Sequence, residues 1–403
     1  MHLNGKTILV GVSGGIAAYK IPNLVSILVK AGADVHVILT RNGANFIPPA
    51  PFEALTGNRC LSDTFERSFP PEIHHITLAK KADLVLIAPA SANIIGKLAN
   101  GIADDLLSST LLACQCPRLI APAMNTRMFE NPIVQDNIKK LAHYGYIFVE
   151  PEAGHLACGD VGTGKMPEPQ TLFAYMERAL FCEKDLQGQK LLVTAGATQE
   201  AIDPVRYITN HSSGKMGYAI AKAAMLRGAD VTLVTGKTAL APPLFVKTIS
   251  VVSAADMFDA VTQLAAQQDI IIKAAAPADY TPVCAASEKI KKKDGALSIP
   301  LKRTQDILKY LGEHRTPHQF LCGFSMETEN MLQNSRKKLL EKNVDLIAAN
   351  NLKTEGAGFA GDTNVLTLIS RQKEIPLEKM SKDEAAHALL DLILQMKKDA
   401  LPK

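Results

Sequence analysis

Three segments near the amino end of the chain are matched, in the same order, by three segments of its later half. The first set reads NGKTILVGVSGG, AGADVHVILT and KADLVLIAPAS, and the second reads QGQKLLVTAGAT, RGADVTLVTG and QDIIIKAAAPAD. In each copy an apolar, β-branched run ends at a glycine or small polar turn, and a helical stretch leads to the next apolar run. We therefore expect two α/β domains, each with a largely parallel, buried sheet between two layers of helices.

The length of the chain agrees with two domains. At 403 residues, of which 47% are hydrophobic and 21% charged, the chain can form two separate cores. We place the boundary at CEKDLQG, a polar segment ending in glycine, so that one domain covers 1–183 and the other 187–403. A net charge of +4 is small for this length and argues against a dedicated nucleic-acid binder.

Cysteine usage and hydropathy indicate the compartment. The seven cysteines show no CxxC spacing, which argues against a disulfide framework or a structural zinc site. No segment approaches ~18 uninterrupted apolar residues, and the amino end lacks the basic and apolar regions of a leader. We expect a cytoplasmic protein that binds neither membranes nor nucleic acids.

Glycine-rich turns follow the strands of the first half. GVSGGIAAYK leads from a strand into a helix whose free N–H groups suit a phosphate. Because the full GxGxxG spacing is absent, a glycine turn that binds nothing explains this segment equally well. The segment GHLACGDVGTGKM, residues 154–166, surrounds Cys158 with glycines, and this density predicts a mobile loop rather than a regular element.

Three stretches of the first half together resemble the flavin-dependent cysteine decarboxylases: IHHITLAKKADLVLIAPASAN, APAMNTRMFENP and the segment around Cys158. The resemblance implies a flavodoxin-like flavoprotein domain in which FMN oxidises a cysteinyl thiol before carbon dioxide leaves. It makes His75 the active-site histidine, Asn125 the asparagine of the PxMNxxMW motif, and Cys158 the proton-donating flap cysteine. The implied FMN site comprises Ser13, Gly14, Gly15, Thr40, Ser91, Ala92 and Asn93.

The residue types suit this chemistry. An amide such as Asn125 can hold a carboxylate without becoming charged, and His75 can act as a base or orient the thiol near neutral pH. An unperturbed cysteine has a pKa of about 8.5, so at neutral pH it is mostly a thiol and can donate a proton. Phe129 replaces the motif's tryptophan and Lys165 an arginine, which bears on substrate affinity more than on reaction type.

An insertion enlarges the first strand-to-helix connection of the second half. It reads QEAIDPVRYITNHSSGKMG and follows a strand, where open α/β sheets bind ligands. NHSSGKMG predicts a serine N-cap at a helix start that could hold an anion, although a capping turn alone would look the same. SEKIKKKDG places four lysines within five positions. Such a run is either a solvated surface or a source of positive charge that binds a triphosphate.

The stretch TAGATQEAIDPVRYITNHSSGKMGYAIA is similar to the phosphopantothenate–cysteine ligases, and the order of the halves is that of the bifunctional bacterial family of coenzyme A synthesis. The resemblance implies CTP- and Mg²⁺-dependent ligation of 4'-phosphopantothenate with cysteine through an acyl-cytidylate, then FMN-dependent decarboxylation to 4'-phosphopantetheine. It implies that Asn210 binds the acyl-cytidylate and that Arg206 binds a carboxylate or phosphate of the substrate. The metal ligands remain unknown. The implied CTP site comprises Asp279, Lys289, Gln305, Asp306, Ile307, Leu308, Phe324, Lys338 and Lys342.

The same family resemblance implies a homo-oligomer with trimeric decarboxylase contacts and dimeric ligase contacts. Two residues depart from the ligase motifs, Ala197 in place of a glycine and Pro277 in place of a valine. Near the carboxyl end, GAGFAGDTNVLTLI predicts a glycine-rich connection into an edge strand, and SKDEAAHALLDLILQMKK predicts a final, serine-capped amphipathic helix.

Two other functions fit parts of the pattern. The strands and glycine turns alone would suit a nicotinamide-dependent, two-domain reductase, although the incomplete GxGxxG counts against it. A non-catalytic flavin-binding regulator is the second alternative, because some relatives of the decarboxylases regulate phosphatases. The presence of His75, Asn125 and Cys158 together favours catalysis.

Overall fold

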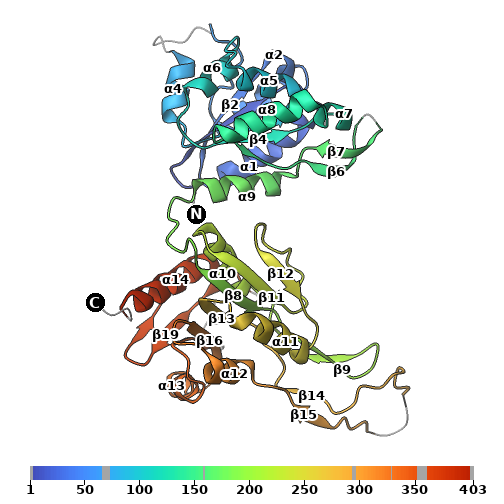
Figure 1. Cartoon of the computed structure of the whole chain (residues 1–403), viewed down its shortest axis with the longest axis vertical. Coiled ribbons are helices and arrows are strands. Elements are labelled where there is room, and N and C mark those ends of the chain that lie inside the picture. The colour runs from blue at the N-terminus through green and yellow to red at the C-terminus, as the bar shows by residue number, and fades with distance from the viewer. Residues whose placement is uncertain are drawn as a thin grey trace. The chain divides into compact units, whose positions relative to one another are not determined.

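The computed structural model describes residues 3–65, 73–157, 159–292, 296–327, 329–351 and 361–399. The chain divides into two compact units, Met1–Cys182 and Glu183–Lys403 (Figure 1). Both are α/β with largely parallel sheets, as the repeated strand pattern predicts. Cys158 and most of the predicted glycine-rich connection, at 352–360, lie outside the described residues. No helix in the described ranges combines the length and apolar content needed to cross a bilayer.

The first unit is built on a five-stranded sheet in which every pair of neighbours is parallel. The strand order is that of flavodoxin-like doubly wound folds, with the direction of winding reversing between β1 and β3. In spatial order the strands are β2 (Asp34–Leu39), β1 (Thr7–Val12), β3 (Leu84–Ala90), β4 (Arg118–Pro122) and β5 (Ile147–Phe148).

Two apolar cores lie on opposite faces of this sheet, because alternate residues of each strand point to opposite sides. Ile8 and Val10 of β1 belong to one core, and Leu9 belongs to the other. The first core is covered by α1 (Ile21–Lys30), α3 (Ala50–Thr56) and α9 (Pro169–Leu180). The second is covered by α4 (His74–Lys81), α5 (Ala92–Ala99), α6 (Leu106–Ala113) and α8 (Pro132–His143).

The glycine-rich segment around Cys158 contains a β-hairpin, so the prediction of a segment without regular structure was wrong. β6 (Glu152–His155) pairs antiparallel with β7 (Val161–Lys165). The glycines allow β7 to lie close to α7 (Thr126–Phe129) and to Met124 before it. A Cβ on Gly162 would lie 2.6 Å from Thr126 Oγ1, and one on Gly164 would clash with Met124 O. Close packing, rather than mobility, accounts for these two glycines.

The second unit contains an eight-stranded sheet that is parallel from β12 to β17. Its first six positions follow the doubly wound order 3-2-1-4-5-6, with the reversal between β8 and β13. In spatial order the strands are β12 (Lys247–Ser250), β11 (Asp230–Thr235), β8 (Lys190–Ala195), β13 (Ile270–Lys273), β16 (Phe320–Glu327), β17 (Leu346–Asn351), β19 (Leu366–Ser370) and β20 (Glu374–Pro376).

The strand predicted to form the edge of this sheet is internal. β19 pairs antiparallel with β17 on one side and with β20 on the other. A turn closed by the hydrogen bond from Ser370 N to Lys373 O, at 2.9 Å, folds the chain back into β20. The sequence analysis overlooked β20 because it has only three residues and includes Pro376.

Helices cover both faces of the second sheet. α10 (Lys215–Leu226) packs with α14 (Lys382–Asp399), while α11 (Ala254–Ala265), α12 (Ile307–His314) and α13 (Met331–Glu341) contribute to the core on the other face. The predicted serine cap of the last helix is confirmed, because Ser381 Oγ accepts from Glu384 N at 3.2 Å.

The cap of α10 differs from the prediction. The residue before this helix is Gly214, with φ of +78° and no side-chain cap, rather than a serine. A Cβ at Gly214 would lie 2.8 Å from Thr238 Cγ2, so a side chain is excluded there. Ser212, two residues earlier, still accepts from Gly214 N at 3.4 Å.

Two short hairpins extend the second unit beyond its main sheet (Figure 1). β9 (Gln199–Ala201) pairs with β10 (Tyr207–Thr209), and β14 (Tyr280–Pro282) pairs with β15 (Leu301–Arg303). β9 also contacts β14, so the two hairpins form one projection, which we call the arm. A further short pair joins β18 (Thr363–Asn364) to β21 (Met380–Ser381).

Candidate functional site

The carboxyl ends of β2, β1 and β3 bring the predicted FMN residues to one edge of the first sheet. Ser13 connects two of these strand ends, because its Oγ donates to Pro89 O at 2.7 Å and accepts from Ser91 N at 3.0 Å. Thr40 follows β2 and caps the short helix α2 (Arg41–Ala44), accepting from Gly43 N at 3.0 Å. This edge is the switch point of the fold, where doubly wound sheets bind ligands.

The residues at this edge fit a flavin phosphate. Ser91 is the N-cap of α5 but makes no side-chain cap hydrogen bond, which leaves its hydroxyl and the first N–H groups of the helix to bind an anion. Ala92 and Asn93 form the first turn of the same helix. A Cβ on Gly14 would lie 2.6 Å from Asn42 Cβ, so the turn after β1 requires glycine to pack against the β2 loop.

The structure connects Asn125 with the β6–β7 hairpin. Asn125 follows β4 and caps α7, accepting from Arg127 N at 2.9 Å. Its amide nitrogen donates to Asp160 Oδ2 at 2.6 Å, between the hairpin's two strands. The sequence analysis missed Asp160, although its place two residues after the flap cysteine was a usable signal. His75 lies half-buried in the first turn of α4.

We expect Gly164→Ala to loosen the hairpin from the Asn125 segment. Gly164 has φ of +140°, and its carbonyl accepts from Met124 N at 3.1 Å, so an added Cβ meets both backbone strain and Met124 O. The cost is about 1–3 kcal/mol. For the decarboxylation that the family resemblance implies, we expect kcat/KM to fall about tenfold or more when the site is misplaced, while the implied ligation is unchanged.

Gly154→Ala in the partner strand is the matched control. The nearest atom to its added Cβ is Lys165 Cδ at 4.0 Å, and Gly154 has no positive φ. Thermal unfolding and both activities of the full chain are the measurements. Equal losses in the two variants would show that close packing at Gly164 is unimportant.

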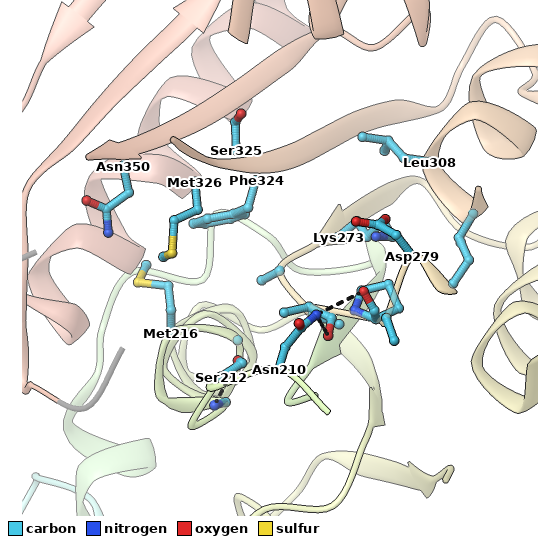
Figure 2. A pocket seen from close by; sticks show the side chains of 18 of the residues that line it. Asn210, Ser212, Met216, Lys273, Asp279, Leu308, Phe324, Ser325, Met326 and Asn350 are labelled. Atoms are coloured by element: carbon cyan, nitrogen blue, oxygen red, sulfur yellow. Dashed lines mark hydrogen bonds between the residues drawn. The ribbon is translucent and has the colours of Figure 1, made fainter. Parts of the chain in front are cut away.

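A cavity of about 750 Å³ lies at the switch point of the second unit (Figure 2). It is enclosed by the connection into α10, the carboxyl ends of β13 and β16, the start of α12, and α13. Nine of the eleven ligase residues named from the sequence line it: Asn210, Asp279, Gln305, Asp306, Ile307, Leu308, Phe324, Lys338 and Lys342.

Asn210 is held in the lining of the cavity by two carbonyl groups. Its Nδ2 donates to Ala276 O at 3.1 Å and to Pro277 O at 3.2 Å (Figure 2). These contacts link the connection into α10 to the segment after β13. Ala197 is buried and forms an isolated β-bridge with Ala276. Ala197 and Pro277, the two residues that depart from the ligase motifs, therefore both lie near Asn210.

Lysines dominate the charge at the α12–α13 end of the cavity. Lys342 pairs with Asp306 at 2.7 Å, and Lys338 donates to Phe324 O at 3.3 Å. Burial would raise the pKa of Asp306, but the hydrogen bonds from Lys342 and Lys309 N and the charges of Lys342 and Lys273 together hold that pKa below its usual range. Burial and the neighbouring Lys342 lower the pKa of Lys338. This electropositive region suits an anionic ligand.

Sequence analysis missed a third lysine in this cluster, Lys273. It is the last residue of β13, and burial together with Lys338 and Lys342 lowers its pKa to about 8. The usable signal was a lysine ending an apolar strand at the ligand-binding edge of the sheet.

Arg206 and Lys289 are absent from the cavity lining. Arg206 lies by the β9–β10 hairpin, pairs with Asp203, and donates to Ile290 O at 2.8 Å. The Arg206 hydrogen bond holds the pKa of Asp203 well below its usual range. Lys289 is exposed in the segment that joins β14 to β15. Both residues therefore belong to the arm.

Comparison with known proteins gives matches over both units. The family model "DNA/pantothenate metabolism flavoprotein C-terminal domain" matches residues 186–396, and the model "Flavoprotein" matches residues 1–180. The "Coenzyme A biosynthesis bifunctional protein CoaBC" of Bacillus subtilis (strain 168) is 47% identical over 402 residues, covering 98% of each chain. The Vibrio cholerae (serotype O1, strain N16961) protein of that name is 44% identical over 393 residues, covering 97% of this chain and 98% of its own.

One solved structure with a related sequence is the crystal structure of the C-terminal domain of a protein with that same name. It is 44% identical, covers 54% of this chain and 100% of that chain, and has a TM-score of 0.47.

Two doubly wound units, one with a flavodoxin-like sheet and one with a lysine-lined cavity, define a two-domain flavoprotein enzyme. The chain belongs to the family of bifunctional coenzyme A biosynthesis proteins. The resemblance read from its motifs is thus confirmed, and the reductase and regulator alternatives are set aside.

Proposed function

We propose that the two units divide the family's two activities. The second unit, over 187–403, joins 4'-phosphopantothenate to cysteine at the expense of CTP. The first unit, over 1–183, then decarboxylates the product to 4'-phosphopantetheine with FMN. The observation that carries the ligase assignment is the cavity in which the tethered Asn210 lies together with the lysine cluster.

In the proposed ligation, a carboxylate oxygen of the acid substrate attacks the α-phosphorus of CTP, and pyrophosphate leaves. The cysteine amine then attacks the acyl carbon, and CMP leaves with the C–O bond electrons. Asn210 binds and orients the acyl-cytidylate, since its amide is already fixed by two carbonyls. Lys338 and Lys342 offset the negative charge that develops on the phosphates.

The nucleotide's other contacts follow from the lining. Residues 305–308 form the start of α12, Asp306 caps that helix by accepting from Lys309 N at 3.0 Å, and Phe324 offers an apolar ring. Asp279 lies where it can contact the ribose or base. We propose that Mg²⁺ enters with the triphosphate, because Mg²⁺ commonly takes one or two carboxylates plus substrate phosphates. Asp306 is already paired with Lys342, so among the described residues Asp279 is the carboxylate of this lining that forms no ion pair.

In the proposed decarboxylation, Ser13, Thr40 and the first turn of α5 would hold FMN, which would supply the two-electron oxidation of the cysteinyl group and the later reduction. Asn125 donates amide hydrogens to the departing carboxylate, and His75 acts as a base or orients the thiol. Cys158 delivers the proton to the product. The Asn125–Asp160 hydrogen bond supports this scheme, because it connects the carboxylate-binding amide to the segment that carries Cys158.

We also propose that the enzyme is a cytoplasmic homo-oligomer with trimeric decarboxylase and dimeric ligase contacts. The location of Arg206 and Lys289 on the arm, outside the cavity of their own chain, supports ligase pairing. In a dimer the arm of one copy could bring these two cations to the cavity of the other.

Incubation of the pure full-length chain with 4'-phosphopantothenate, cysteine and CTP tests the function. We expect pyrophosphate, carbon dioxide and 4'-phosphopantetheine to form together. Omitting CTP removes the activating phosphorus, so ligation should stop while supplied 4'-phosphopantothenoylcysteine is still decarboxylated. A protein that holds no FMN, or that releases no pyrophosphate, contradicts the corresponding half of the proposal.

A further inference from the structure

Lys273 is a cavity-lining cation to which neither the motifs nor the proposed mechanism assigns a task. It ends β13, and its side chain lies on the same side of the cavity as Asp279 (Figure 2). Within the described part of the chain Lys273 makes no hydrogen bond and no ion pair. Its two lysine neighbours differ in this respect, since Lys342 pairs with Asp306 and Lys338 donates to Phe324 O.

The charges around Lys273 come from three directions. Lys338 and Lys342 face it from α13 and the end of that helix, Asp306 from the cap of α12, and Asp279 from the segment after its own strand. Three cations thus meet two carboxylates, and one carboxylate is already paired with Lys342. Lys273 is half-buried, and a cation withdrawn from water without a partner is costly. The cluster therefore carries excess positive charge that an anion would neutralise. Lys273 is the lysine of the three without a hydrogen bond or ion pair in the described part of the chain.

We propose that Lys273 binds a phosphate group of the nucleoside triphosphate and takes up a proton when the nucleotide binds. This inference rests on the proposed use of CTP by the same cavity. A triphosphate brings several negative charges to Lys273, Lys338 and Lys342. These charges neutralise the positive charge that the two carboxylates do not.

The uptake of a proton follows because nucleotide binding and the protonation of Lys273 favour each other. In the free protein the pKa of Lys273 is about 8, so the amine loses its charge as the pH rises through this value. A bound phosphate favours the charged form and raises the pKa of Lys273. CTP affinity is then greatest below pH 8 and falls above it, by up to about tenfold per pH unit until the pKa of the complex is reached.

Isothermal titration calorimetry of CTP binding to the full-length protein tests this prediction. Measurements at pH 7, 8 and 9, each in two buffers with different ionisation enthalpies, give both the affinity and the number of protons taken up. We expect wild-type affinity to fall about tenfold from pH 7 to pH 9, with proton uptake approaching one per nucleotide at pH 9. In Lys273→Met the pH dependence and the proton uptake should both disappear.

Two further variants separate this effect from a general loss of charge or packing. Lys309→Met removes a lysine of α12 that is not part of the lining and should keep the wild-type pH profile. Lys338→Met removes a like charge next to Lys273, so the midpoint of the affinity change should move to higher pH. A purely structural role for Lys273 predicts no such movement.

The outcomes distinguish this inference from the proposed function. CTP binding with the same pH profile in wild type and Lys273→Met, or wild-type binding without proton uptake, overturns the inference and leaves the ligase proposal standing. Absence of CTP binding to the wild type at every pH overturns both. If Lys273→Met fails to fold, proton uptake by the wild type and the shifted midpoint in Lys338→Met decide the question.

Discussion

Asn210→Asp is expected to abolish ligation while decarboxylation of supplied 4'-phosphopantothenoylcysteine continues. The native amide donates to the carbonyls of Ala276 and Pro277 at 3.1 and 3.2 Å. A carboxylate has no hydrogen to donate, and its charge is repelled by the same two oxygens and by the substrate phosphates. The variant loses the tether and places a negative charge beside the acyl-cytidylate, so we expect kcat of ligation to fall about a hundred- to thousandfold.

Pyrophosphate release and 4'-phosphopantetheine formation, measured on one preparation, check this prediction. Decarboxylation serves as the internal control, because Asn210 belongs to the second unit and decarboxylation is proposed for the first. A ligase rate within a few-fold of wild type would mean that Asn210 does not steer the intermediate. Loss of both activities together would indicate misfolding, which the thermal unfolding curve of the variant reveals.

Cys158→Ser is expected to remove product formation in the first unit and to leave bound flavin in place. A serine hydroxyl is a far weaker acid than a thiol, so it cannot deliver the proton that completes 4'-phosphopantetheine at neutral pH. Losing a positioned acid costs about 10²–10⁴-fold in rate. The residues proposed for FMN follow β1, β2 and β3, so their geometry does not depend on this side chain.

Product release and flavin absorbance of the purified variant provide the measurements. Cys182→Ser is the matched control, because Cys182 is at the end of the same unit and its Sγ donates to Leu180 O, two residues earlier. Full turnover by Cys158→Ser would remove the proton-donor role from this residue. A colourless variant would instead give Cys158 a part in holding the flavin.

The strands of the repeated pattern and the final helix could be predicted because they are governed by local pattern. β1, β3, β8 and β13 are largely apolar, β-branched runs followed by small residues, and alternate residues of β1 and β3 enter opposite cores, as a strand with period two requires. The final helix could be recognised from its cap, since Ser381 and Glu384 are only three residues apart. Such features need no partner from elsewhere in the chain.

The predictions that failed concern segments whose conformation depends on distant atoms. Gly164 appears flexible in the sequence, but it is required because Met124 O lies where its side chain would be. Gly214 stands where a serine cap was expected, because its φ is positive and an added Cβ would lie 2.8 Å from Thr238 Cγ2. β19 was assigned to the edge because β20, which covers it, is too short to be recognised.

By itself, the sequence determined the doubly wound plan of both units and the edges at which ligands bind, because strand periodicity and glycine turns act over a few residues. Only the tertiary structure decided which polar groups meet at those edges. Asp160 reaches Asn125 across 35 positions, and Lys273 joins Lys338 and Lys342 from separate elements. Charge and hydrogen bonding depend on distance in space, and parallel strands bring together residues that lie far apart in the chain.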